Sequence, residues 1–501
     1  MKNTLCHRAA RPLIVFSVAA FLGGCAVAPV PFTAEEFSTK AKSDRVSMFE
    51  GQEPLLKPLT LSDAVARVLL YNLDKRSKMM EEALAFGQLN LDNFDMLPKL
   101  NTDASYAHRS NHATTTSTDS VTLKPSLADP SYSLDRNRTL ADLGFTWNLL
   151  DFGVSYYNAH QSADRTLIAA ERRRKTVANL VQEVRFSFWR AAAAQVLKDK
   201  VVKTVAAAEA ALASSETVEA ENLRNPIDTL RIQKALLESI RQLEGIDQEL
   251  STGKAELAAL VNLPPGSDFT LDLTGSGGMV IPQWSLPIDV MEETALVNNP
   301  DLREQDYQSR MSIADTHKEI LKLLPGVSIN FSRQYDSNSF LQDNKWNEAG
   351  ARITWNLLGL LSAPDRIKQA HSTEQLVKIK RLALRMAVLA QVHVISSQYH
   401  GAAKQFERAD KLWSIEQRLA EASGNQQRSG TVNEIERIGV ETSAISAELR
   451  RFQTYAQLQS TFGKLQTTLG ADPISGKLDS LTVEGISGSV QLGTLPTKAT
   501  Q

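Results

Sequence analysis

A five-residue string, Thr-Trp-Asn-Leu-Leu, occurs twice in this chain, at 146–150 and at 354–358. A string of this length that contains Trp rarely recurs by chance. Leu97-Pro98 precedes the first copy and Leu324-Pro325 the second, and a long Ala-rich helical pattern follows each copy. The copies lie about 200 residues apart, far more than the 20–50 residues of a solenoid unit. The sequence therefore predicts a duplicated domain.

Two β-strands are predicted in each half. In the strand with the first copy, Leu143, Phe145 and Trp147 alternate with Gly144 and Thr146, which is the period of a strand with one apolar and one polar face. The second copy repeats this alternation. We expect strands over about 99–110, 139–150, 326–337 and 347–358.

A long helical hairpin is predicted after each pair of strands. The first begins near residue 154, turns at Asn225-Pro226 and stops at about 262, and the second covers about 364–469. Apolar residues recur at spacings of three and four, as in a coiled coil. A helix of about 70 residues is a rod of roughly 100 Å, because each residue adds 1.5 Å. The sequence thus indicates a mixed, mainly α fold whose unit is helix, β-hairpin and long helical hairpin.

The first residues have the pattern of an export signal. Lys2, Arg8 and Arg11 precede the apolar run 13–22, which is too short to span a bilayer. Leu22-Gly23-Gly24-Cys25 is similar to a bacterial lipobox, so we expect Cys25 to carry lipid, including palmitate. The alternative is a simple signal peptide with an incidental cysteine. Cys6 would leave with the signal, so no disulfide, metal site or cofactor is expected.

The predicted organisation has six parts. The parts are a signal peptide (1–24), a lipidated tether (25–59), the first repeat (60–263), a Gly- and Pro-rich linker (264–287), the second repeat (288–470) and an irregular tail (471–501). The tether is expected to be extended because it contains several prolines. The net charge of −2 gives no reason to expect nucleic acid as a partner.

Four strands with a polar face cannot stand alone in a bilayer, because an open sheet leaves backbone groups unpaired in hydrocarbon. Other copies must complete the sheet. Two copies give eight strands, whose interior side chains fill, whereas three copies give twelve and a water-filled lumen. We therefore expect a homotrimer with a 12-stranded membrane β-barrel, continued by an α-helical barrel that projects from the membrane.

The order of these motifs resembles the TolC family of outer-membrane efflux proteins. The resemblance depends on the Leu-Pro strand starts, Trp-Asn-Leu-Leu-Asp-Phe-Gly at 147–153, the duplication and the Arg428-Ser429-Gly430-Thr431 turn, and it covers about 60–470. A lipidated Cys25 is similar to the OprM-like branch. The resemblance implies a passive, non-enzymatic channel, anchored in the outer membrane and opened when a periplasmic adaptor and an inner-membrane pump dock. Drugs, metal ions or proteins could each use such a passage, and the class of pump stays open.

The resemblance also implies a periplasmic gate and a docking surface at the helical turns. Family members have acidic residues six and nine positions after the turn glycine, which here are Glu436 and Gly439, so a second acidic ring is in doubt. Glu434 and Glu441 are further candidates. Three carboxylates that converge on an axis repel one another and attract cations. The implied docking residues are Arg224, Asn225, Pro226, Asp228, Arg428, Gly430 and Thr431.

Other motifs receive simpler interpretations. His393 and His400 are better explained by helix packing than by metal binding, and the basic run 172–175 by a solvated helix face. Trp147 and Trp355 are expected to face outward at the periplasmic border of the membrane, where tryptophan is favoured. The alternative to a channel is a periplasmic coiled-coil structural or adaptor lipoprotein without a barrel. An exported hydrolase would need a catalytic motif that we do not find.

Overall fold

The structure, a computed structural model, describes residues 29–125, 129–221, 225–283, 286–428, 434–473 and 482–490. These residues fall into two units, one ending at Gln52 and the other beginning at Glu53. The first unit contains helix α2 (Ala34–Ser47), which Thr33 and Glu36 cap reciprocally. The expectation of a fully extended tether is therefore wrong, because the prolines at 29 and 31 precede the cap. The predicted signal peptide and Cys25 lie outside the described residues.

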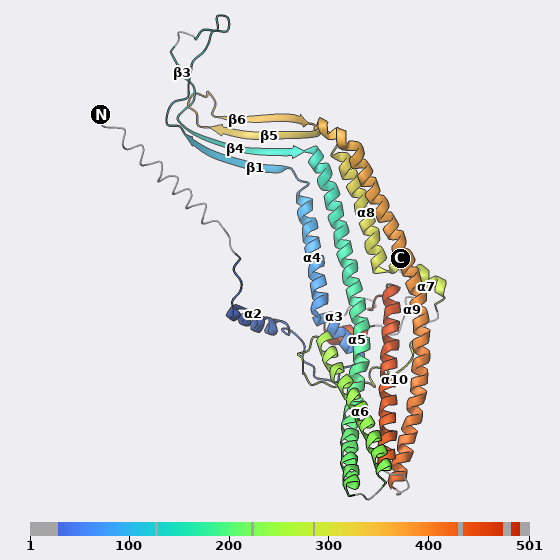
Figure 1. Cartoon of the computed structure of the whole chain (residues 1–501). Coiled ribbons are helices and arrows are strands. Elements are labelled where there is room, and N and C mark those ends of the chain that lie inside the picture. The colour runs from blue at the N-terminus through green and yellow to red at the C-terminus, as the bar shows by residue number, and fades with distance from the viewer. Residues whose placement is uncertain are drawn as a thin grey trace, which may run out of the picture. The chain divides into compact units, whose positions relative to one another are not determined.

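The second unit contains one antiparallel four-stranded sheet, in the order β1–β4–β5–β6 (Figure 1). Its strands are β1 (Lys99–His108), β4 (Asn137–Asn148), β5 (Gly326–Asp336) and β6 (Lys345–Thr354). The pairing of β4 with β5 joins the hairpins of the two halves into one sheet. A short hairpin of β2 (Thr114–Thr115) and β3 (Ser131–Tyr132) lies in the long connection between β1 and β4.

The sheet has one apolar and one polar face, because directly opposite residues of antiparallel strands point to the same side. Phe145 of β4 pairs with Leu100 and with Phe331, which in turn pairs with Ala349. The next row is polar: Thr146 pairs with Asn330. Phe145 and Phe331 remain 37% and 50% exposed, so the described chain leaves this apolar face largely uncovered.

Four helices contact one another in sequence next to the sheet. They are α4 (Leu73–Phe94), α5 (Leu149–Ala220), α8 (Pro300–Leu321) and α9 (Ala363–Arg428). Helix α5 begins directly after β4. Asn148, the last residue of β4, caps this helix, because its side chain accepts hydrogen bonds from the N–H groups of Leu150 and Asp151. A 3₁₀ helix, η1 (Leu357–Ser362), connects β6 to α9. Short helices α3 (Leu61–Tyr71) and α7 (Ile288–Asn298) precede α4 and α8.

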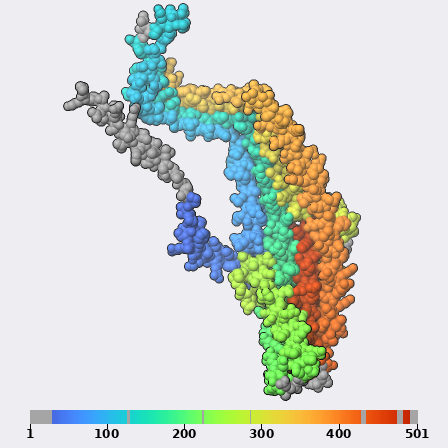
Figure 2. All heavy atoms as spheres, viewed as in Figure 1, coloured from blue at the N-terminus to red at the C-terminus, as the bar shows by residue number. Residues whose placement is uncertain are grey.

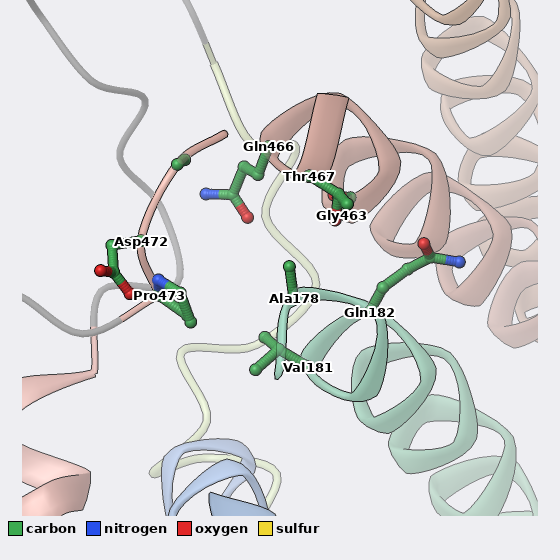
Figure 3. Close-up of a pocket in the computed structure, with 9 residues that line it drawn as sticks. Ala178, Val181, Gln182, Gly463, Gln466, Thr467, Asp472 and Pro473 are labelled. Atoms are coloured by element: carbon green, nitrogen blue, oxygen red, sulfur yellow. The ribbon is translucent and has the colours of Figure 1, made fainter. Parts of the chain in front are cut away.

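Farther from the sheet, the contacts run α6–α5–α10–α9, with α6 (Pro226–Leu260) and α10 (Glu434–Thr468) as the returning helices (Figure 2). Glycines let both returning helices pack closely on α5. A Cβ atom at Gly253 would lie 3.0 Å from the carbonyl oxygen of Arg190, and one at Gly463 would lie 3.0 Å from Cγ of Gln182. The gap beside Gly463 is a cavity of about 10 Å³, room for one water at most (Figure 3). Among the described residues, no helix combines the length and the apolar character that a bilayer crossing needs.

The main hydrophobic core surrounds the middle of α5, where Phe188 and Trp189 are buried. The linker contributes to this core, since Leu271 is buried and forms a parallel β-bridge with Leu59. A short helix, α11 (Val483–Ser489), packs on α3 through buried Ile486, so the expectation of an entirely irregular tail is wrong. Two apolar residues in a short segment that also contains two glycines are too weak a signal for a helix.

Two tyrosines hold the linker against the second helical hairpin. The hydroxyl of Tyr399 donates to the carbonyl of Pro282, and that of Tyr455 donates to the carbonyl of Val280 at 2.9 Å. Burial raises the pKa of Tyr399 to about 12, so this hydroxyl stays protonated and remains a donor at neutral pH. The segment between the repeats is therefore bonded to the helices and does more than connect them.

Candidate functional site at the helical tip

The helical tip comprises the ends of α5 and α9 and the beginnings of α6 and α10. Asn225 caps α6 by accepting a hydrogen bond from the N–H of Ile227 at 3.0 Å, and Pro226 occupies the first helical position, where its missing N–H costs nothing. Asp228 is exposed and lies 3.6 Å from Arg231. Among the other predicted docking residues, Arg428 is the last residue of α9, and Arg224, Gly430 and Thr431 lie outside the described residues.

The three candidate gate carboxylates lie in the first two turns of α10, which begins at Glu434. Arg437 lies between two of them: its Nη1 is 2.6 Å from Glu441, and its Nη2 is 4.0 Å from Glu434. Glu436 is exposed and does not take part in these two ion pairs. Sequence reasoning missed Arg437, although spacings of three and four residues place it beside both carboxylates on one helix face.

The tip has only a small hydrophobic core. Ile438 of α10 is fully buried against Ala208 of α5 and against Leu236 and Ile240 of α6. Beside this cluster is a groove of about 400 Å³ between α5, α6 and α10. It is lined by alanine, serine and threonine side chains together with the apolar Val218, Ile232 and Ile435 and the carboxylate of Glu434. The start of α10 therefore lies next to both helices of the first helical hairpin, α5 and α6.

Nearer the sheet, the basic run 172–175 is partly solvated, since Arg172 and Lys175 are exposed, but it is also paired with carboxylates. Every residue of the run has an acidic partner at 2.6–2.8 Å: the pairs are Arg172–Glu304, Arg173–Glu82, Arg174–Glu171 and Lys175–Asp301. Successive helical residues point about 100° apart, so four in a row reach different neighbours. Charge spacing could not reveal this, because the partners on α4 and α8 are distant in sequence.

Both histidines are exposed, so the expectation that they are packed between helices is wrong. The imidazole Nε2 of His393 lies 2.5 Å from Glu292 of α7, and His400 stacks edge-on against Tyr399. Within the described part of the chain, no group of three or more His, Cys, Asp or Glu residues could hold a metal ion.

The two tryptophans of the repeated string have different surroundings. Trp147 lies in β4, two residues from Phe145 and so on the apolar face, and its ring contacts Phe152 at 5.6 Å. Its indole nitrogen is buried without a hydrogen-bond partner. Trp355 is 49% exposed and donates to the carbonyl of Leu323 at 3.0 Å. The predicted strand end at about 358 is wrong, because β6 stops at Thr354 and Trp355 lies just beyond it.

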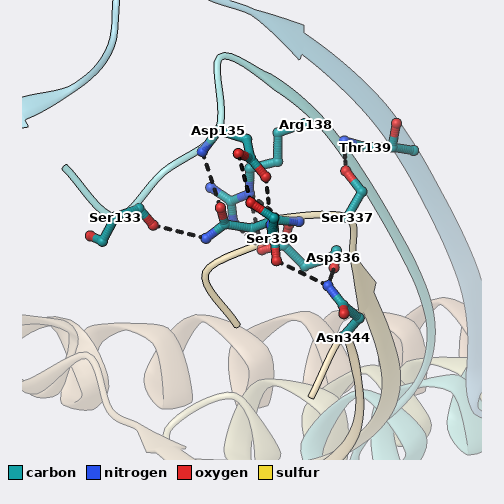
Figure 4. A network of polar contacts seen from close by, with 9 residues as sticks. Ser133, Asp135, Arg138, Thr139, Asp336, Ser337, Ser339 and Asn344 are labelled. Atoms are coloured by element: carbon teal, nitrogen blue, oxygen red, sulfur yellow. Dashed lines mark hydrogen bonds and ion pairs between the residues drawn. The ribbon is translucent and has the colours of Figure 1, made fainter. Parts of the chain in front are cut away.

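At the opposite end of the sheet, a polar network joins the connections of the two hairpins (Figure 4). Arg138 forms a bidentate pair with buried Asp336, the shortest N···O distance being 2.6 Å. The side chain of Asn338 accepts from the N–H of Asp135 and donates to the carbonyl of Ser133, both at 3.0 Å. The long and short connections are therefore bonded to each other at this end.

Several solved structures share this architecture. No protein-family model matches the chain, and no curated protein matches it. Solved structures do: the channel-forming protein CusC (TM-score 0.61, 15% identity, covering 84% of this chain and 96% of CusC) and the outer-membrane channel OprN (0.61, 18%, 82% and 90%). The Campylobacter jejuni outer-membrane channel CmeC gives a TM-score of 0.62 at 10% identity, covering 93% of this chain and 98% of CmeC.

These neighbours define the class: the chain has the fold of an outer-membrane channel subunit. It is the fold of the TolC family, so the family resemblance noted in the sequence is confirmed at the level of the fold. The three neighbours named above are channel proteins. The lipidated OprM-like branch stays a prediction.

Proposed function

We propose that this protein is the outer-membrane channel of a tripartite efflux or type I export system. It acts as a passive duct and performs no bond chemistry. Its sheet lies in the outer membrane, Cys25 carries a lipid anchor, and the helices extend into the periplasm. Docking of a periplasmic adaptor and an inner-membrane pump opens the helical tip.

The observation that carries this proposal is the state of the sheet in the described chain: both edge strands have an unpaired side, and the apolar face is largely uncovered. No strand among the described residues pairs with the outer edge of β1 or β6. These edge strands run in opposite directions, so β6 of one copy can pair antiparallel with β1 of the next. Ring closure by three copies gives a barrel of twelve strands, with the apolar face toward lipid and every backbone group paired.

The helices support the same assembly. The outermost helices, α4 and α9, both expose large apolar side chains, which is unusual for a helix that faces only water. On α4 these are Met79, Met80, Leu84, Phe86, Leu91 and Phe94, and on α9 they are Leu376, Ile379, Leu382 and Met386. Contact between α9 of one copy and α4 of the next would bury both sets and continue the barrel as a helical tube.

The tip is the proposed point of control. Glu434, Glu436 and Glu441 form the gate, and the residues around the α5–α6 and α9–α10 turns receive the adaptor. The small core around Ile438 leaves this region less tightly held than the middle of α5, as a movable gate requires. Selection among drugs, metal ions and proteins belongs to the pump.

A solubility and conductance experiment tests the channel against the alternative, a coiled-coil lipoprotein without a barrel. The variant Cys25→Ala, exported through its own signal, removes the lipid anchor while leaving the sheet intact. We expect this variant to require detergent, to migrate as a trimer in light scattering, and to form ion-conducting pores in planar bilayers. A monomer that stays soluble without detergent would overturn the proposal, because an exposed apolar sheet cannot remain dispersed in water.

A further inference from the structure

Arg437 distinguishes the tip of α10 from a simple ring of acidic residues. Its guanidinium is held by Glu441 at 2.6 Å, one turn later in the helix, and approaches Glu434 to 4.0 Å. The side chain is only 23% exposed, and its Nε is buried with no hydrogen-bond partner among the residues that the structure describes. The charge is therefore fixed in position, unlike that of most surface arginines.

The packing around Arg437 explains why it is fixed. Ile438, the next residue, is fully buried in the small core of the tip, and Ile435 packs against the same cluster. These two anchors set the rotation of α10, so Arg437 is held at the edge of the core with one carboxylate on each side. Arg231, in the second turn of α6, differs: its side chain is 78% exposed and lies 3.6 Å from Asp228.

The charge balance follows from this geometry. Three carboxylates and one arginine give each copy a charge of −2 at the start of α10, so three copies carry −6 in place of −9. Like charges that converge on an axis raise the free energy of a closed tip and favour cations inside it. A fixed guanidinium within that ring reduces both effects, and it acts mainly on Glu434 and Glu441.

We propose that Arg437 is a selectivity-determining residue of the channel, which limits the cation preference of the tip by neutralising part of its acidic ring. This inference rests on the proposed function, since it requires the start of α10 to face the pore. Glu436 adds to the negative charge of the same ring. Ion selectivity should therefore depend on Arg437 and Glu436 in opposite directions.

Reversal potentials in planar bilayers under a KCl gradient test this inference with the full-length trimer. Arg437→Gln should raise the potassium-to-chloride permeability ratio by about threefold, and Glu436→Gln should lower it by a similar factor. Arg437→Lys, which keeps the charge, should stay near the wild-type ratio. Arg231→Gln is the matched control, because it removes an arginine from the equivalent turn of the other hairpin, where it is not packed between carboxylates.

Each outcome decides one question. A permeability ratio that is unchanged in Arg437→Gln, in a trimer that conducts like the wild type, overturns the inference and leaves the channel proposal intact. An equal rise in Arg231→Gln overturns it as well, because a general charge effect would then suffice. A wild-type protein that forms no pores contradicts the proposed function itself. If Arg437→Gln does not assemble, two single variants answer the same question. Arg437→Lys, which keeps the charge, should retain the wild-type ratio, and Glu441→Gln, which removes the main partner of the guanidinium, should lower it. A changed ratio in the first or an unchanged ratio in the second overturns the inference.

Discussion

Each half of the chain has a contact between the start of one helix and the end of a returning helix, which we call the helical joint. The two halves form this joint in different ways. In the first half, Asn72 caps α4 and its amide donates to the carbonyl of Leu260 at 3.2 Å. In the second half, Asn299 caps α8 and its amide donates to the carbonyl of Thr468 at 3.0 Å. Each asparagine therefore ties the start of one helix to the end of a returning helix.

The two joints differ at the residue that lies two positions after the carbonyl of Leu260 or Thr468, where the backbone is left-handed. Asn262 occupies this position in the first half with φ +58°, and Gly470 occupies it in the second with φ +66°. A Cβ at Gly470 would lie 2.1 Å from the carbonyl oxygen of Asn298. Arg174 then donates to the carbonyls of both Asn298 and Gly470, at 3.0 and 2.8 Å. The second joint is thus closed by backbone contact and an arginine, whereas the first has room for a side chain.

The largest expected effect comes from Gly470→Ala. The methyl group must enter the space of a backbone carbonyl while the residue keeps a left-handed conformation, so we expect a loss of about 3 kcal/mol or more in unfolding free energy. Urea denaturation of the detergent-solubilised trimer, followed by circular dichroism, measures this loss. Asn262→Ala is the control, because a side chain is already accommodated at this left-handed position, and we expect a smaller loss of about 1 kcal/mol. Equal losses in the two variants would show that the joints do not differ as described.

The strands and helices of both halves could be read from the sequence because alternation and three-to-four spacing are local patterns. The repeated string even placed the point where β4 continues into α5. The joints could not be read in this way. Arg174 pairs with backbone groups more than a hundred residues away, and carbonyls carry no sequence signal. The same limit hid the partners of the basic run, whereas Arg437 was within reach of helix-spacing rules.

A smaller effect is expected from Arg174→Ala. The change leaves the carbonyls of Asn298 and Gly470 without this donor, and it leaves buried Glu171 with Arg303 at 3.4 Å as its nearest cation. We expect a loss of about 2 kcal/mol, measured by the same denaturation experiment. Arg172→Ala is the matched control, since the Arg172 side chain is 51% exposed and its pair with Glu304 should contribute about 1 kcal/mol or less. If Arg174→Ala were as mild as the control, the arginine would not be what closes the second joint.

The smallest effect separates the two copies of the repeated string. Trp355→Phe removes the hydrogen bond from the indole N–H to the carbonyl of Leu323, for which we expect a loss of about 1 kcal/mol. Trp147→Phe removes an N–H that is buried without a partner, so the loss should be near zero or the protein slightly more stable. Thermal denaturation of the two trimers side by side makes the comparison. A larger loss of stability in Trp147→Phe would mean that the Trp147 N–H gains a hydrogen-bond partner when three copies assemble. The two tryptophans would then differ in the single chain but not in the assembled channel.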